Sequence, residues 1–432
     1  MMDIEGWESK PLFELLDQIM DFRGRTPKKL DMEWGGGDIP ALSANNVEMG
    51  EINFSKECYL ASDALYRKWM TKGDTQKGDV VLTTEAPLGN VAVIPDEQRY
   101  ILSQRVILLR ANSAYLCSDY LSHYLMSEGF QNLMRQQSSG TTATGIQRAK
   151  LEPLLIKFPS SKIEQKQIAE VLSTIDRAIA QTEAIIAKQQ RIKTGLMQDL
   201  LTKGIDENGN IRSEATHQFK DSAIGRIPVE WEMISMDKIT TKIVDGIHHT
   251  PNYVQDGIPF IVVTDLTSSE GINFTPSRFI TEKNHQEFYK RADPKAKDVL
   301  VTKDGTLGVA RIVPDEAPDF SIFVSVAMLR PKNTKCISEL IWSFFESGRF
   351  LAQLGSLSAG TGLAHIHLEH FRKFQINLMP IDEQKRIFEV LNHQQLLLQK
   401  QSQNLEKLKH QKTGLMQDLL TGKVRVTSLN KE

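Results

Sequence analysis

A cluster of cations lies near the start of the 432-residue chain, in the segment Phe22-Arg-Gly-Arg-Thr-Pro-Lys-Lys29. Guanidinium and ammonium groups on a loop that also holds glycine and proline are suited to phosphate oxygens or to guanine edges. The candidate contact residues in this segment are Arg23, Arg25, Thr26, Lys28 and Lys29. A charged loop that only faces water is an equally good interpretation of the same residues.

A related loop occurs in the second half of the chain, as Asp245-Gly-Ile-His-His-Thr-Pro251. It ends on the same Thr-Pro pair, but the cations are replaced. The candidate contacts here are His248, His249 and Thr250. Equivalent loops with different polar side chains are what two modules reading different sequences would show.

Further polar segments could hold phosphates through hydroxyl and backbone N–H groups. The candidates are Thr141, Thr142, Arg148 and Lys150 in the first half, and Thr361, His365 and His367 in the second. Asn45 and Asn46 could each bind an adenine edge through two hydrogen bonds. Plain turns between strands explain these segments nearly as well.

The motifs of an enzyme that acts on DNA are missing from the sequence. It has no N-P-P-Y or D-P-P-Y run, no F-x-G-x-G turn for S-adenosylmethionine, and no phosphate-binding G-x-x-x-x-G-K-[ST] loop. The set His365-x-His367-x-x-His370 has no cysteine or carboxylate pair to complete a metal site. Glu164-Gln-Lys166 resembles the end of a nuclease motif but lacks its Pro-Asp partner. We therefore expect no catalytic residue, no cofactor and no metal in this chain.

An internal repeat organises the whole sequence. Lys193-Thr-Gly-Leu-Met-Gln-Asp-Leu-Leu-Thr202 recurs without a change as residues 412–421, and Glu164-Gln-Lys166 recurs as residues 383–385. Weaker matches at nearly the same offset continue into the preceding domains. Nearly fixed helix ends on divergent domains suggest one common partner surface and two different targets. The candidate docking residues are Lys193, Leu196, Met197, Asp199, Lys412, Leu415, Met416 and Asp418.

The repeated segments have the apolar spacing of long helices. In heptads, residues 168, 175, 182, 189 and 196 form one column of the first helix, and residues 172, 179, 186, 193 and 200 form the other. A helix with so narrow an apolar seam must pair. Because the second domain lies between the two helices in the chain, we expect antiparallel pairing. The alternative is that each helix packs only on its own domain.

The expected fold class is α+β. We expect two mixed α/β domains, each followed by a long helix, with the helices pairing as an antiparallel coiled-coil spacer. The expected boundaries are a first domain 1–158, a helix 159–202, a linker 203–226, a second domain 227–380, a helix 381–421 and a tail 422–432.

Composition limits the remaining possibilities. The net charge of −2 is low for a protein that grips DNA alone, so partners are expected to supply much of the phosphate contact. No apolar run reaches the roughly 18 to 20 residues of a membrane span. Three widely spaced cysteines exclude a full disulfide framework and fit a reducing cytoplasm.

In combination, these features resemble the specificity subunits of type I restriction–modification systems. The residues that carry the resemblance are the helix ends 193–202 and 412–421, the Glu-Gln-Lys openings, Arg25-Thr26-Pro27, Ile39-Pro40, Gly78-Asp-Val-Val-Leu-Thr83 and Gly204-Ile-Asp-Glu-Asn-Gly-Asn210. The similarity covers essentially the whole chain.

The resemblance implies a DNA-binding subunit that is not an enzyme. Its two target-recognition domains each read one half of a split, asymmetric site in double-stranded DNA. Two modification subunits, which use S-adenosylmethionine to methylate adenine, and restriction subunits, which use ATP and Mg, are the implied partners. Two other interpretations remain open, a specificity subunit of a related class with a fused methylase–nuclease partner, and a structural tether that does not bind DNA.

Overall fold

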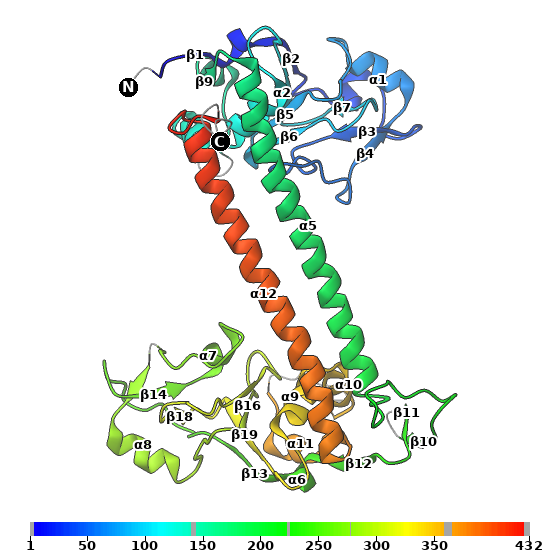
Figure 1. The fold of residues 1–432 in the computed structure, drawn as a ribbon, viewed down its shortest axis with the longest axis vertical. Helices are drawn as coiled ribbons and strands as arrows, with labels where there is room; N and C mark the ends of the chain where they lie inside the picture. Colours follow the sequence, from blue (N-terminus) through cyan, green and yellow to red (C-terminus); the bar gives the residue numbers. More distant parts are fainter. Residues whose placement is uncertain (1–3, 140–143, 223–224, 277, 358–364, 427–432) are drawn as a thin grey trace. The chain divides into compact units, whose positions relative to one another are not determined.

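The computed structural model describes residues 4–139, 144–222, 225–276, 278–357 and 365–426. The chain divides into two compact units (Figure 1). Unit 1 contains Met1–Ala184 and Ser402–Glu432, and unit 2 contains Ile185–Gln401.

Unit 1 is built on an antiparallel sheet in the order β2-β8-β5-β6. Its strands are β2 (Leu16–Asp21), β8 (Val106–Ala111), β5 (Val80–Thr84) and β6 (Leu88–Val93). A three-stranded sheet holds β4 (Tyr59–Ala61), β3 (Ile39–Leu42) and β7 (Ile101–Leu102), and β1 (Trp7–Pro11) pairs with β9 (Leu155–Pro159). The short helices are η1 (Leu12–Leu15), η2 (Pro27–Leu30), α1 (Asp63–Trp69), α2 (Ser118–Met126), α3 (Glu128–Gln137) and α4 (Arg148–Leu151).

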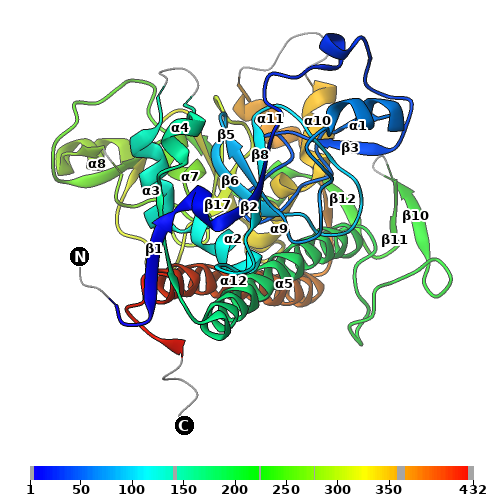
Figure 2. The ribbon, with the colours of Figure 1, turned by 90° about the horizontal axis from the view of Figure 1, so that it is seen from above.

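Strand β5 lies at the centre of unit 1 because both of its faces are apolar. Successive side chains point to opposite faces of a sheet. Val80 and Leu82 accordingly join the core beneath α2 and α3, whereas Val81 joins the core beneath α1. Helix α2 lies between the central strands and the first part of the long helix α5 (Figure 2), where His123 Nε2 and Ser173 Oγ are 3.1 Å apart.

Unit 2 repeats this architecture. Its central sheet has the order β13-β19-β16-β17, with β13 (Thr240–Asp245), β19 (Val326–Pro331), β16 (Val299–Thr302) and β17 (Ala310–Ile312). The other strands are β15 (Phe279–Ile280), β14 (Ile258–Ile261), β18 (Ser321–Ile322), β12 (Glu232–Ser235), β20 (Gln375–Leu378), β10 (Phe219–Ser222) and β11 (Gly225–Pro228). The short helices are α6 (Met236–Ile239), α7 (Val263–Thr267), α8 (Glu282–Tyr289), α9 (Ser338–Glu346), α10 (Gly348–Leu357) and α11 (Leu368–Lys373).

Two long helices follow the domains, as predicted. Helices α5 (Lys162–Leu200) and α12 (Ile381–Leu419) have 39 residues each. The predicted seam columns of α5 are confirmed, because every one of their positions is buried or half-buried. The same holds for the equivalent columns of α12, residues 387, 394, 401, 408 and 415 with residues 391, 398, 405, 412 and 419.

The two helices run antiparallel within each unit. In unit 1, Lys412 Nζ lies 2.6 Å from Asp176 Oδ1, and Lys409 Nζ lies 3.2 Å from Glu183 Oε1. In unit 2, Lys193 Nζ donates to Gln395 Oε1 at 2.7 Å. Later residues of α5 contact earlier residues of α12, as expected for antiparallel helices. Two polar seam residues also pair with each other in unit 2, since Gln394 Nε2 donates to Gln189 Oε1 at 2.5 Å.

The end of each helix is buried in the unit that it enters. Leu200, Leu201 and Ile205 belong to the core of unit 2. Leu420 and Val426 belong to the core of unit 1. Helices α5 and α12 end at Leu200 and Leu419, and residues that follow them in the expected linker and tail contribute to the cores of the units.

Equivalent ion pairs fasten these ends. Glu383, in the first turn of α12, accepts hydrogen bonds from Arg212 and from Trp231 Nε1, the latter at 3.1 Å. Glu164, in the first turn of α5, binds Arg425 Nε at 2.6 Å. The segment expected to be a tail is thus part of unit 1 as far as Val426, and its role was missed because Arg425 and Glu164 are distant in sequence.

Candidate nucleic-acid interface

Several turns of unit 1 meet at one end of its central sheet. Strands β2 and β5 end where β8 begins, since Asp21 pairs with Ile107 and Thr83 with Val106. The turn after β3 joins them through Ala44 N, which donates to Gln104 O at 3.3 Å. The sheet-end surface of unit 1 is defined as residues 22–29, 43–46, 85–87, 103–105 and 145–150.

Unit 2 builds the equivalent surface with equivalent backbone bonds. Lys303 N donates to Ser325 O at 2.9 Å, just as Thr84 N donates to Arg105 O at 2.8 Å in unit 1. The sheet-end surface of unit 2 is defined as residues 246–251, 262–265, 304–306, 323–325 and 365–370. The same scaffold therefore presents two different sets of side chains.

Two of the predicted cations in the first loop are bound within unit 1. Arg23 binds Asp21 with both ends of its guanidinium, at 2.6 and 2.9 Å, and donates to Thr84 Oγ1 at 3.1 Å. Burial by itself would raise the pKa of Asp21, but the hydrogen bonds and charge of Arg23 outweigh it and lower that pKa. Arg25 binds the carbonyl of Trp69 and stacks 4.8 Å above the ring of Phe22. Both arginines therefore hold the loop in place.

The two lysines of this loop face solvent, whereas its threonine has a structural role. Lys28 and Lys29 are exposed, and Lys29 Nζ donates to Gly24 O at 2.7 Å. Thr26 caps the short helix η2, because its Oγ1 accepts from Lys29 N at 3.4 Å. Lys28 and Lys29 are the exposed cations of the predicted loop.

The structure contradicts a direct base contact for Asn46. Its side chain is fully buried, and its Oδ1 accepts from Ser43 Oγ at 2.9 Å while its Nδ2 donates to Glu57 O at 3.2 Å. Asp265 closes the equivalent turn of unit 2 by accepting from Val262 N at 2.9 Å. Burial raises the pKa of Asp265. These two residues shape their turns, whereas the neighbouring Asn45 is exposed.

Arg148 and Lys150 are exposed on the last segment of the unit 1 surface. Arg148 pairs with Glu152 at 2.7 Å and lies 5.3 Å above the ring of Phe13. Thr141, Thr142 and Thr361 lie outside the described residues.

The predicted histidine loop of unit 2 is organised by a buried carboxylate. Asp245 Oδ1 lies 3.1 Å from His248 Nε2 and also binds Arg291. Burial would raise the pKa of Asp245, but the hydrogen bonds of Arg291 and His248 lower it. His249 meets the ring of Phe288 edge to face at 5.6 Å. His248, His249 and Thr250 are all exposed, as a contact surface requires.

His365 and His367 lie side by side at the same end of unit 2. His365 Nε2 and His367 Nδ1 are 3.1 Å apart, and the two ring centres are 4.0 Å apart. Burial and the neighbouring His367 lower the pKa of His370. Among the described residues, no group of three or more histidine, cysteine or acidic side chains is placed to hold a metal ion.

The predicted docking residues have contacts inside the units. Leu196 and Met197 pack against the core of unit 2, and Leu415 and Met416 against the core of unit 1. The charged members pair locally: Lys193 with Gln395, Lys412 with Asp176, Asp199 with Lys203 at 2.8 Å and Asp418 with Lys423 at 3.1 Å. Internal packing thus accounts for much of the repeated block. The positions exposed in both copies are Thr194, Gly195 and Gln198, with Thr413, Gly414 and Gln417.

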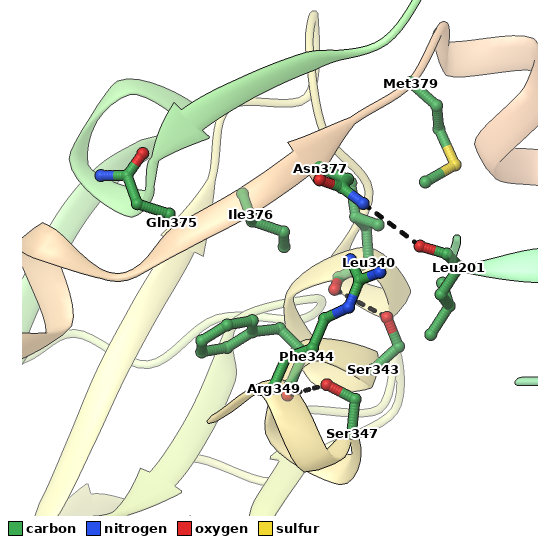
Figure 3. Close-up of a pocket in the computed structure, with 10 residues that line it drawn as sticks. All are labelled: Leu201, Leu340, Ser343, Phe344, Ser347, Arg349, Gln375, Ile376, Asn377 and Met379. Atoms are coloured by element: carbon green, nitrogen blue, oxygen red, sulfur yellow. Dashed lines mark hydrogen bonds between the residues drawn. The ribbon is translucent and has the colours of Figure 1, made fainter. Parts of the chain in front are cut away.

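A small cavity in unit 2 is lined by residues of α9, α10 and β20 and by Leu201 (Figure 3). Its volume of about 20 Å³ suits about one water molecule. Asn377 Nδ2 donates there to Leu201 O at 3.3 Å, and burial lowers the pKa of Arg349. Its lining includes none of the residues that define the sheet-end surface of unit 2. We therefore assign it to packing rather than to a ligand.

Sequence reasoning missed two exposed residues of the unit 1 surface, Gln104 and Arg105. They border a hollow of about 320 Å³ together with Ser43, Asn45, Lys56 and Asn90. Arg105 has a left-handed backbone with φ 66°, although its neighbours in sequence include no glycine. No sequence pattern distinguishes such a residue from an ordinary strand-flanking arginine.

Comparisons with known proteins match this duplicated architecture. The family model described as Type I restriction modification DNA specificity domain matches residues 4–190 and 228–409. The chain therefore belongs to this family and carries two copies of its domain.

Individual relatives cover the whole chain. The putative type I restriction enzyme MjaX specificity subunit of Methanocaldococcus jannaschii is 24% identical over 98% of this chain and 94% of its own length. The MjaVIII specificity subunit of the same organism is 24% identical over 99% of this chain and 95% of its own length. The crystal structure of the S subunit of a type I restriction-modification system from M. genitalium shares the fold, with a TM-score of 0.57, 15% identity and 96% of each chain covered.

None of the described helices is both long enough and apolar enough to cross a bilayer.

Proposed function

We propose that this chain is the specificity subunit of a type I restriction–modification complex, in which unit 1 and unit 2 each read one half of a bipartite, asymmetric DNA site. The observation that carries the proposal is the pair of sheet-end surfaces. Their backbone bonds are equivalent, but exposed lysines and Asn45 in unit 1 are replaced by histidines in unit 2. One scaffold with two sets of polar side chains suits two different base sequences.

The chain itself is proposed to be non-catalytic. It supplies recognition, while partner subunits supply chemistry. Two modification subunits, which carry S-adenosylmethionine, methylate adenine, and a restriction subunit, which carries ATP and Mg, cleaves. The complex works on DNA in the cytoplasm.

The repeated helix ends support two copies of one partner. The exposed side chains Thr194 and Gln198 of α5 recur as Thr413 and Gln417 of α12, around Gly195 and Gly414. Packing inside a unit does not require identity at exposed positions. An identical exposed strip in both units is therefore suited to two identical modification subunits.

The low net charge fits this division of labour. With a net charge of −2, the chain has little excess cation to neutralise phosphates. Exposed lysines such as Lys28 and Lys29 supply local contacts. The modification subunits are proposed to supply the remaining grip on the duplex.

The test is selection of bound duplexes from a random library by the full chain, alone and with the modification subunits of its host. We expect a split motif with two constant halves and a fixed gap, and methylated adenine at the same motif in the host genome. A structural tether would select no motif. A related class would yield the same motif, but with a fused methylase–nuclease partner encoded beside the chain.

A further inference from the structure

The turn that borders the hollow on the sheet-end surface of unit 1 is built differently in unit 2. In unit 1 the turn before β8 carries Gln104 and Arg105, both exposed. The corresponding residues before β19 are Val324 and Ser325. In unit 2, Val324 N donates to Ile247 O at 3.0 Å, so the loop of residues 246–251 covers this turn. Ser325 is buried.

The backbone around the hollow is held in an uncommon conformation. Two of the four described non-glycine residues with positive φ border it, Ala86 at 37° and Arg105 at 66°. Such conformations cost energy and persist where the surrounding structure imposes them, often at binding sites. Here the backbone bond from Thr84 N to Arg105 O and the bond from Ala44 N to Gln104 O fix the turn.

The side chains of this turn are free to reach outward. Arg105 is 46% exposed, and its nearest carboxylate, Glu85, lies 3.9 Å away, so the guanidinium is only loosely held. By contrast, Arg23 and Arg25 in the neighbouring loop are occupied by Asp21 and Trp69. A guanidinium can donate two hydrogen bonds to the O6 and N7 atoms of guanine, and a glutamine amide can bind adenine N6 and N7.

From this geometry we infer that Arg105 reads a guanine, with Gln104 contacting the adjacent base pair, in the half-site bound by unit 1. The inference rests on the proposed function and names the residues that determine specificity within it. Because unit 2 has Val324 and Ser325 at these positions, its half-site is read by other residues. The turn thus contributes to the asymmetry of the whole motif.

The experiment uses the full chain assembled with its modification subunits and measures base preference at every position of both half-sites. Asparagine tolerates the left-handed region, so Arg105→Asn removes the cation with little effect on the turn. We expect preference for guanine to fall roughly 10- to 100-fold at one position of the unit 1 half-site, with the other positions and the unit 2 half-site unchanged. Gln104→Ala should relax an adjacent position.

Arg99→Ala is the matched control. Arg99 precedes β7 and Arg105 follows it, the two are 48% and 46% exposed, and each has a carboxylate neighbour. We expect the control to keep the wild-type motif.

Three results would overturn the inference. Equal weakening on all sequences, with a shallower salt dependence, identifies Arg105 as a phosphate contact. An unchanged motif shows that the turn does not touch bases, and equal loss at both half-sites shows a general defect. A wild-type complex without any motif would instead overturn the proposed function together with this inference.

Discussion

Each unit has a buried glutamate in the first turn of a long helix, Glu164 in unit 1 and Glu383 in unit 2, and each glutamate pairs with an arginine. Glu383 receives Arg212, Trp231 and Ile205 N, and the side chains of Glu383 and Arg212 are only 2% and 10% exposed. Removing one partner of a buried pair leaves the other charge without compensation, which costs far more than losing an exposed pair. Substitution of these residues should therefore destabilise the helix ends more than substitution of exposed charged residues does.

Glu383→Ala should lower the free energy of unfolding of unit 2 by about 3 to 5 kcal/mol, because it leaves Arg212 buried and unpaired. Urea denaturation of the full chain measures the change. The control is Glu214→Ala, whose partner Arg226 is 49% exposed, and which should cost at most about 1 kcal/mol. Equal effects of the two substitutions would contradict the assigned role of Glu383.

Asp245 should make stability depend on pH. Its folded pKa is lowered below the ordinary value of 3.8, because Arg291 and His248 outweigh the effect of burial. The carboxylate therefore contributes stability above the unfolded pKa, and this contribution is lost as the pH falls through the folded pKa. We expect wild type to lose more stability between pH 5 and pH 3 than Asp245→Asn does.

Asp221 provides the comparison for this titration, since its side chain is 97% exposed. Asp221→Asn should follow the wild-type pH profile in the same urea series. A wild-type profile as flat as that of Asp245→Asn would show that the buried carboxylate does not contribute.

The sequence did not reveal which side chains of the sheet-end surfaces are buried and which are exposed. Asn46 is buried because its amide reaches Glu57 O, eleven positions away, and no local pattern reveals that closure. Arg105 escaped notice because a left-handed arginine has no sequence signature. The exposed His248, His249 and Lys28 were found because loop composition alone indicates exposure.

At the scale of elements, the long helices were predictable, but the packing of the residues that follow them was not. A heptad pattern with only a few polar interruptions, such as Gln189 and Lys193, predicts α5 and α12 without reference to distant residues. Whether Ile205 or Val426 is buried depends on a core built from other parts of the chain. The central sheets were predicted only as mixed α/β, because strand order depends on long-range pairing.

The end of α12 should be essential to unit 1. Leu419 is 2% exposed in its core, so Leu419→Ala should destabilise unit 1 by about 2 to 5 kcal/mol through lost packing and a cavity. Leu397→Ala removes the same atoms from a 37% exposed position of the same helix and should have a much smaller effect. Limited proteolysis of residues 4–139 with increasing urea measures both variants. Equal sensitivity would count against the assigned packing.

At the scale of the whole molecule, we propose that the helices set the distance between the two DNA half-sites that the units recognise. Seven residues inserted after Ala184 together with seven after Gln401 add one heptad to each helix between the compact units. At 1.5 Å per residue this adds about 10 Å, or about three base pairs of DNA. We expect a longer gap, unchanged half-sites and reduced activity, because the added base pairs also rotate one half-site about the duplex axis.

Mapping of methylated adenines in cells that carry the double insertion measures the gap. Insertion after Ala184 alone is the control. It lengthens α5 alone, so the two helices cannot keep their paired register in both units, and the packing of one unit should fail. A double insertion with full activity and the original gap would show that the helices do not set the spacing.

Recognition of one half-site should also be independent of recognition of the other. Exchanging residues 1–158 for those of a relative replaces the sheet-end surface of unit 1 but none of unit 2. One half of the methylated motif should change, while the other half and the gap persist. Methylome sequencing of the hybrid shows the outcome, and a change in both halves would mean that the units read DNA jointly.

The division of unit 1 into two separated stretches of chain also has a consequence for biosynthesis. Unit 2 is a continuous stretch, Ile185–Gln401, and all of it has been synthesised before the last part of unit 1 is made. Unit 1 lacks Leu419, Leu420 and Val426 from its core, and Arg425 beside Glu164, until translation is almost complete. The domain translated first is therefore the domain that matures last. Until then its unfilled apolar core and the unpaired Glu164 are exposed, so a truncated or stalled chain presents a site that chaperones and proteases recognise.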